Sequence, residues 1–139
     1  MILGIGTDIV DARRIAAVIR RFPNRFISRI FTDLEKKAAE HSSNKAEYFA
    51  KRFAAKEAAY KALSSANVSG LGWREVETLS KFNGVPTINF KGRWKIALES
   101  MVPSGYKASV SISLSDEPPY ALAFVIVNAI PVDWINENE

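Results

Sequence analysis

Cysteine is absent from the 139-residue chain, and histidine occurs only once, at His41. The absence of cysteine excludes disulfide bonds, thiolate metal sites and cysteine nucleophiles. A zinc enzyme normally has several histidine or cysteine ligands, so a lone histidine in a polar stretch argues against a zinc site. We expect His41 to lie on the surface.

Long apolar runs are also missing. No stretch approaches the roughly 20 apolar residues of a membrane helix, and the first residues lack the charged start and cleavage site of a signal peptide. We therefore expect a cytoplasmic protein without a membrane partner. The length fits one compact domain, which we place at residues 1–130. A polar tail without regular structure is expected over residues 131–139.

The chain carries a net charge of +4 and has an isoelectric point near 9.4. Such a balance points to an anionic partner, which could be nucleic acid, a phosphorylated cofactor or an acidic protein. The sequence contains no recognised nucleic-acid-binding module and lacks the alternation of aromatic and basic residues typical of an RNA-binding sheet. We therefore expect no nucleic-acid partner.

Hydrophobic periodicity predicts a strand followed by helices in the first half of the chain, and mostly strands after that. The order favours an α+β domain, with helices packed on a small antiparallel sheet. Thr32-Asp33-Leu34-Glu35 matches a capping box, which marks a helix start, and Asn83-Gly84 is typical of a hairpin turn. The predicted strands are 2–10, 73–79, 86–90, 106–114 and 120–127, and the predicted helices are 12–22, a short one around 26–31, 32–41, 45–64 and 91–101.

Asp8 stands out because it lies in the apolar strand Ile2–Val10. Removing a carboxylate from water costs several kcal/mol unless it is paired or binds a cation. Asp8 is either a strand-end acid that faces water or a residue with a charged partner, and the apolar residues that follow it favour the second alternative.

A second group of candidate functional residues lies on the long predicted helix, 45–64. Glu57 and Lys61 are one turn apart, an ordinary helix-stabilising pair worth about 0.2–0.5 kcal/mol. However, Mg²⁺ is usually held by one or two carboxylates together with substrate phosphates. Asp8, Glu57 and the neighbouring basic residues are therefore the minimum set that magnesium-assisted phosphoryl chemistry needs.

Two segments resemble signatures of the holo-acyl-carrier-protein synthase family, the short trimeric class of phosphopantetheinyl transferases. Gly4-Ile5-Gly6-Thr7-Asp8-Ile9-Val10 is similar to its N-terminal motif, and the run from Arg52 to Ala62 is similar to its central motif. Asn83-Gly84-Val85-Pro86 and the segment 110–115 resemble two further family motifs. Together these segments cover nearly the whole chain.

The resemblance implies the phosphopantetheinyl transferase fold, a homotrimer with active sites between subunits, and Mg²⁺ held by Asp8 and Glu57. It implies that a serine hydroxyl of acyl carrier protein attacks the β-phosphate of coenzyme A, which releases adenosine 3′,5′-bisphosphate and serves fatty acid biosynthesis. Lys61 is expected near the phosphates. The base is either Glu57, acting through a metal-bound water, or Lys61.

The resemblance also assigns two sets of binding residues. Those expected around coenzyme A are Arg52, Phe53, Lys61, Ser64, Gly84 and Pro86. Those expected to dock the acidic carrier protein are Arg14, Arg25, Phe26 and Arg29. Docking of this kind should weaken as salt is added.

Three positions depart from the family pattern. Ser64 and Ser65 stand where a glycine-rich turn is usual, Asp116 stands where a histidine is common, and Val85 replaces a lysine. The contacts of the usual residues do not transfer to these positions. The departures leave Asp8, Glu57 and Lys61 unchanged, and they leave open which carrier proteins and which acyl forms of coenzyme A are accepted.

Two other hypotheses fit the same residues. One is a non-catalytic basic domain that binds nucleic acid or an acidic protein, in which Asp8 and Glu57 are structural. The other is a family member that has lost activity through the serines at 64 and 65. A nucleic-acid binder would show a steep salt dependence without needing a metal, whereas a transferase needs both the metal and coenzyme A.

Overall fold

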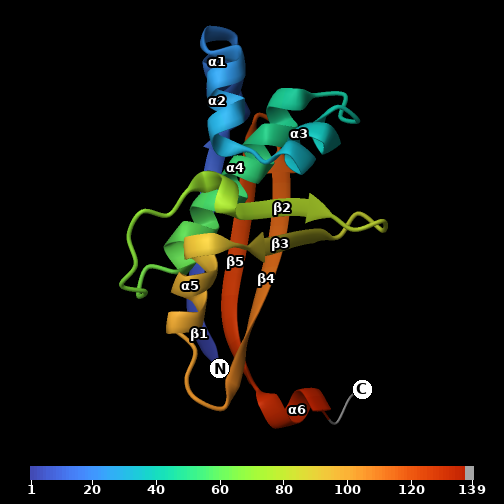
Figure 1. The fold of residues 1–139 in the computed structure, drawn as a ribbon. Coiled ribbons are helices and arrows are strands. Elements are labelled where there is room, and N and C mark those ends of the chain that lie inside the picture. Colours follow the sequence, from blue (N-terminus) through green and yellow to red (C-terminus); the bar gives the residue numbers. More distant parts are fainter. Residues whose placement is uncertain (137–139) are drawn as a thin grey trace.

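The computed structural model describes residues 1–136 and has an α+β architecture, as predicted (Figure 1). Within these residues no helix is both long and apolar enough to cross a membrane. Strands β1 (Ile2–Asp11), β5 (Tyr120–Pro131) and β4 (Tyr106–Glu117) form an antiparallel sheet in that order. The elements are β1 (Ile2–Asp11), α1 (Ala12–Arg21), α2 (Pro23–Ile30), α3 (Asp33–Ala39), α4 (Lys45–Ala62), the 3₁₀ turn η1 (Trp73–Glu75), β2 (Val76–Ser80), β3 (Pro86–Phe90), α5 (Gly92–Ser100), β4 (Tyr106–Glu117), β5 (Tyr120–Pro131) and α6 (Val132–Asn136).

The expectation of one sheet is wrong, because β2 and β3 form a separate two-stranded sheet. This hairpin crosses the long strands β4 and β5 (Figure 1). Side chains bond to backbone groups of β2 that would otherwise pair with another strand. The Thr78 amide donates to Glu35 Oε2 at 2.9 Å, and the Val76 carbonyl accepts from Lys56 Nζ at 2.7 Å.

Several predicted boundaries also change. The segment 73–75 is a 3₁₀ turn rather than the start of a strand. Strand β4 ends at Glu117 rather than at 114, because it pairs with β5 as far as Glu117↔Tyr120 and leaves a turn of two prolines. Strand β5 ends at Pro131 rather than at 127, because it pairs with the start of β4 as far as Tyr106↔Pro131. The expected irregular tail is wrong for residues 132–136, where the Val132 amide donates to the Gly105 carbonyl at 3.0 Å and α6 begins. Residues 137–139 of that tail lie outside the described part.

The capping box at the start of α3 is confirmed. The Glu35 amide donates to Thr32 Oγ1 at 3.2 Å, and the Thr32 amide donates to Glu35 Oε1 at 2.8 Å. These bonds satisfy backbone donors that the first turn of a helix leaves free. His41, beyond the end of α3, is exposed as expected.

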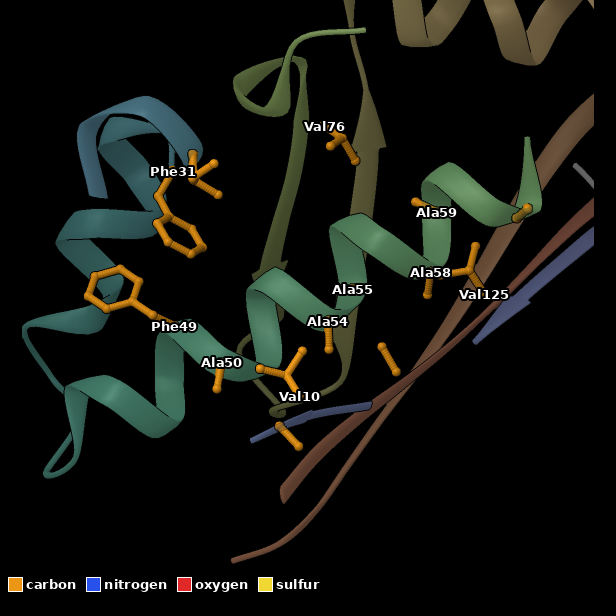
Figure 2. Close-up of a cluster of buried hydrophobic side chains, with 14 of the residues drawn as sticks. Val10, Phe31, Phe49, Ala50, Ala54, Ala55, Ala58, Ala59, Val76 and Val125 are labelled. Atoms are coloured by element: carbon orange, nitrogen blue, oxygen red, sulfur yellow. The ribbon is translucent and has the colours of Figure 1, made fainter. Parts of the chain in front are cut away.

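The core is built on α4, in which every alanine from Ala50 to Ala62 is at most 1% exposed and packs against the neighbouring layers (Figure 2). Ala58 and Ala62 lie under β1 at the two glycines of that strand. A Cβ atom added to Gly6 would overlap the Ala58 carbonyl oxygen, and one added to Gly4 would overlap that of Ala62. Small residues on both elements therefore allow the strand and the helix to touch backbone to backbone.

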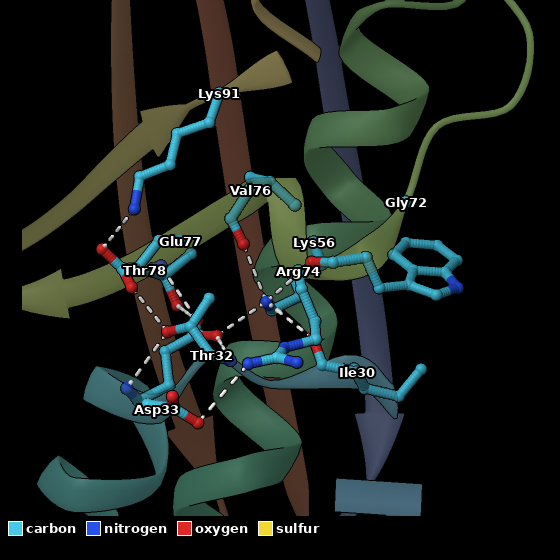
Figure 3. Close-up of polar contacts among 12 residues, drawn as sticks. Ile30, Thr32, Asp33, Lys56, Gly72, Arg74, Val76, Glu77, Thr78 and Lys91 are labelled. Atoms are coloured by element: carbon cyan, nitrogen blue, oxygen red, sulfur yellow. Dashed lines mark hydrogen bonds and ion pairs between the residues drawn. The ribbon is translucent and has the colours of Figure 1, made fainter. Parts of the chain in front are cut away.

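The other side of α4 is fixed by a buried ion pair (Figure 3). The side chains of Lys56 and Glu35 are both 0% exposed, and Lys56 Nζ lies 2.7 Å from Glu35 Oε1. The ammonium also donates to the carbonyls of Ile30, Trp73 and Val76 at 2.7–2.9 Å. Burial lowers the pKa of Lys56, while the charge of Glu35 opposes that shift. One side chain thus joins α2, α3, η1 and β2 to α4.

Substitution of Gly6 tests the contact between β1 and α4. Gly6→Ala should lower the free energy of unfolding by about 3 kcal/mol, because the new methyl group meets a backbone oxygen that cannot move independently. The matched control is Gly72→Ala, since Gly72 has φ −86° and its added Cβ would make only ordinary contacts, the nearest at 3.6 Å. Urea denaturation measures both variants, and equal stabilities would contradict the close approach.

Candidate active site

Asp8 lies where the tight contact between β1 and α4 ends. Gly4, Gly6 and Asp8 alternate along one face of the strand, so Asp8 points toward the helix that the glycines touch. Its carboxylate Oδ1 is 3.1 Å from Lys61 Nζ, which also donates to the Thr7 carbonyl at 2.9 Å. The Asp8 side chain is 17% exposed and that of Lys61 is 52% exposed. Of the two alternatives for Asp8, the structure therefore shows a residue with a charged partner, and this partner is Lys61.

Glu57 lies one helical turn before Lys61 and lines a cleft of about 270 Å³ together with Asp8. Burial raises the pKa of the Glu57 carboxyl, the charge of Asp8 raises it further, and the charge of Lys61 opposes the shift. The described residues contain no group of three or more histidine, cysteine or acidic side chains suited to a metal. What the cleft offers is two carboxylates, the number with which proteins commonly hold Mg²⁺.

Two of the four predicted docking residues line this same cleft. Arg14 and Phe26 reach it from α1 and α2, and the Phe26 ring packs on Phe53 at a centroid distance of 6.2 Å. Arg25 and Arg29 are exposed on α2 and do not line the cleft. Arg14 is therefore the one predicted docking cation that the structure places in the same cleft as the carboxylates.

The predicted coenzyme A residues are divided between two places. Phe53 lines the cleft of Asp8 and Glu57. Arg52, Gly84 and Pro86 line a second cleft of about 260 Å³ between α4, the β2–β3 hairpin and β4, which we call the Arg52 cleft. Adjacent residues of a helix point in directions about 100° apart, which is why Arg52 and Phe53 separate.

Arg52 is the most buried charged group of the second cleft. It is 6% exposed, its Nη2 donates to Ser80 Oγ at 3.0 Å, and its guanidinium lies 4.6 Å from the ring centroid of Tyr48. Gly84 has φ +84° and open space around it. Sequence reasoning missed Ser80. The predicted hairpin turn could have identified it, because Ser80 pairs with Pro86 across the β2–β3 ladder and so lies beside the predicted coenzyme A residues.

Ser64 lies apart from both clefts. It is exposed just beyond α4, where its amide donates to the Lys61 carbonyl at 3.1 Å. Its neighbour Ser65 lines a third cavity with Leu3 and Met101. The structure therefore brings together Asp8, Glu57 and Lys61 in one place and Arg52, Gly84 and Pro86 in another, and it leaves Ser64 at the end of the helix.

Comparison with known proteins identifies relatives over nearly the whole chain. The family described as the 4′-phosphopantetheinyl transferase superfamily matches residues 4–124. The holo-[acyl-carrier-protein] synthase of Methylorubrum extorquens (strain PA1) is 45% identical over 132 residues, which are 95% of this chain and 97% of the relative. That of Azorhizobium caulinodans is 46% identical over 129 residues, 93% of this chain and 95% of the relative.

Solved structures give the same result. The holo-[acyl-carrier-protein] synthase of Neisseria meningitidis superposes with a TM-score of 0.79 at 35% identity, covering 92% of this chain and 99% of that one. The Helicobacter pylori enzyme in complex with coenzyme A gives 0.73 at 27% identity, covering 89% and 99%. With this fold and these relatives, the chain belongs to the holo-acyl-carrier-protein synthase family within the 4′-phosphopantetheinyl transferase superfamily.

Proposed function

We propose that this protein transfers 4′-phosphopantetheine from coenzyme A to a serine of apo-acyl carrier protein, giving holo-acyl carrier protein and adenosine 3′,5′-bisphosphate. The observation that carries the proposal is that Asp8 and Glu57 line one cleft in a chain whose relatives are holo-acyl-carrier-protein synthases. The reaction supports fatty acid biosynthesis, and we place the protein in the cytoplasm.

Magnesium fits the residues of this cleft. Burial raises the pKa of Glu57, and the negative charge of Asp8 raises it further, while the charge of Lys61 opposes the shift. The two carboxylates therefore repel each other. A divalent cation held by Asp8 and Glu57 would relieve the repulsion. When bound, the ion supplies stabilisation of the charge that develops on the pyrophosphate.

The chain's own side chains hold the substrates and move the proton. The Lys61 ammonium is half exposed and lies 3.1 Å from Asp8, so it can contact phosphate oxygens that approach this carboxylate. The serine proton needs an acceptor, and the raised pKa of Glu57 brings this carboxylate closer to the working range of a general base. Lys61 is the alternative base.

The carrier protein docks, in this proposal, on the basic surface of α1 and α2. Arg14 lines the cleft and Arg25 and Arg29 are exposed beside it, while Phe26 offers a half-buried ring. An acidic protein brought there by charge would present its serine next to Asp8 and Glu57. The net charge of +4 favours the same approach.

A homotrimer is supported by the placement of the two clefts. Arg52 and Glu57 are five positions apart on α4 and therefore point about 140° away from each other. We infer that the coenzyme A site joins the carboxylate cleft of one subunit to the Arg52 cleft of another. The sheet also exposes an apolar face, with Ile5 and Ile9 58% and 63% exposed and Leu122 paired opposite Ile9, which suits self-association.

Isosteric substitutions of the carboxylates test the reaction. Asp8→Asn and Glu57→Gln should each lower kcat by at least about a hundredfold, because the loss of metal-held charge stabilisation is worth several kcal/mol. The measurement is the intact mass of apo-acyl carrier protein after incubation with enzyme, coenzyme A and Mg²⁺, with a chelator control. Near-normal rates in either variant would contradict the metal assignment. No mass gain by the unmodified protein would favour a degenerate homologue or a binding domain.

Charge reversal at Arg14 tests the docking surface. Arg14→Glu should raise KM for the carrier protein by about tenfold at low salt while changing kcat less, and the difference should shrink as salt screens the charges. Lys107→Glu is the matched control, because this exposed lysine lies near the start of β4, at the opposite end of the molecule (Figure 1). An unchanged KM in Arg14→Glu would remove the docking surface from the proposal.

The pKa of Glu57 predicts a conflict between function and stability. Because its folded pKa lies above the unfolded value, the protonated form stabilises the fold at low pH, and this contribution is lost as pH rises through the folded pKa. Without metal, Glu57→Gln should therefore raise Tm at pH 7, and the gain should fade as pH falls toward the unfolded pKa near 4.5.

The matched control for this stability measurement is Glu47→Gln on the same helix. Glu47 lies in the first turn of α4, where the helix dipole favours a negative charge, so its neutralisation should not raise Tm. A Glu57→Gln protein that is no more stable than the unmodified one at pH 7 would show that the two carboxylates do not strain the fold.

A further inference from the structure

Strand β1 passes into helix α1 without a loop between them. The strand ends at Asp11, and the helix begins at Ala12. Asp8, on the strand, and Arg14, on the helix, line the same cleft. The direction in which the chain turns at Asp11 therefore sets where Arg14 lies relative to Asp8.

The Asp11 carboxylate fixes this turn in two ways. It is the N-cap of α1, because its Oδ1 accepts a hydrogen bond from the Arg13 amide at 2.9 Å. It also holds the Arg13 guanidinium in a two-pronged contact, with Nε 3.0 Å from Oδ1 and Nη2 2.8 Å from Oδ2. The Asp11 side chain is 21% exposed and that of Arg13 is 70% exposed, so Arg13 holds the capping carboxylate from the solvent side.

The two elements that meet at Asp11 are not held equally. β1 is fixed by its ladder with β5 and by the backbone contact of Gly6 with α4. In contrast, α1 is a surface helix, and only Ala12 and Ile15 of its ten residues are buried. Loss of the Asp11 bonds would therefore shift α1 while Asp8 stays in place.

We propose that Asp11 is a positioning residue of the transfer reaction, which fixes the angle between β1 and α1 so that the serine of a docked carrier protein meets the phosphate held at Asp8. The inference rests on the proposed function, in which the carrier protein docks on α1 and α2. Asp11 does not line the cleft, so it acts through α1 and not on a substrate. Misplacement of reacting groups by about 1 Å can slow a reaction by about a hundredfold.

Steady-state kinetics with apo-acyl carrier protein as the varied substrate test this inference. Asp11→Ala removes both the cap and the ion pair. It should lower kcat by about tenfold and change KM for the carrier protein less, because the docking arginines remain on α1 while the serine is misaligned. This is the reverse of the pattern expected for Arg14→Glu. Asp11→Ser restores a capping oxygen and should recover most of the lost rate.

The matched control is Asn44→Ala, which removes the N-cap of α4, where Asn44 Oδ1 accepts from the Glu47 amide at 3.1 Å. This variant should lose about as much Tm as Asp11→Ala and keep its kcat, because the cap lies at the far end of α4 from Glu57. Calorimetric titration should show unchanged coenzyme A binding in both variants, since Asp8 does not move.

A normal kcat in Asp11→Ala, or an equal loss of kcat in Asn44→Ala, would make Asp11 a structural cap and overturn the inference. A rise in KM without a fall in kcat would overturn it too, because Asp11 would then belong to the docking surface. Weaker coenzyme A binding in Asp11→Ala would show that Asp8 had moved, against the inference. An unmodified protein without transfer activity would contradict the proposed function itself.

Discussion

The contact on which the rest of this structure depends is the backbone-to-backbone approach of β1 to α4. Gly4 and Gly6 leave no side chain between the strand and the carbonyls of Ala58 and Ala62. A larger residue on either element would separate the two and remove Asp8 from the reach of Lys61 and Glu57. The same small side chains that close the core therefore also set the geometry of the carboxylate cleft, so packing and chemistry are not independent here.

The buried ion pair between Lys56 and Glu35 holds α4 from the opposite side. An isolated buried charge would be strongly destabilising, but the four oxygen acceptors around the ammonium compensate for its loss of water. Because these partners come from α2, α3, η1 and β2, the pair fixes the hairpin that forms one wall of the Arg52 cleft. The helix that presents the functional residues is thus held on two faces, which suits a site that needs fixed geometry.

Local signals in the sequence predicted much of this arrangement. The capping box, the alanine helix and the acid in an apolar strand each follow from residue chemistry over a few positions. The second sheet could not be predicted in this way, because its edge bonds to Lys56 and Glu35, which lie 20 and 43 residues away in the chain from the groups they bond. The clefts were likewise beyond local reasoning. Arg52 and Phe53 are neighbours in one motif, yet the tertiary packing around α4 gives each a different surrounding.

The central motif from Arg52 to Ala62 therefore faces three different surroundings. Arg52 lines the Arg52 cleft, Lys56 is buried in the core, Glu57 lines the cleft of Asp8, and Lys61 pairs with Asp8. The helical period assigns these directions, so a single short segment supplies a structural anchor, Lys56, and the side chains to which we assign the phosphate contact and the metal ligand. Arg52 and Glu57 lie five positions apart and point about 140° away from each other. In the proposed function, this divergence is the reason for placing coenzyme A between two subunits.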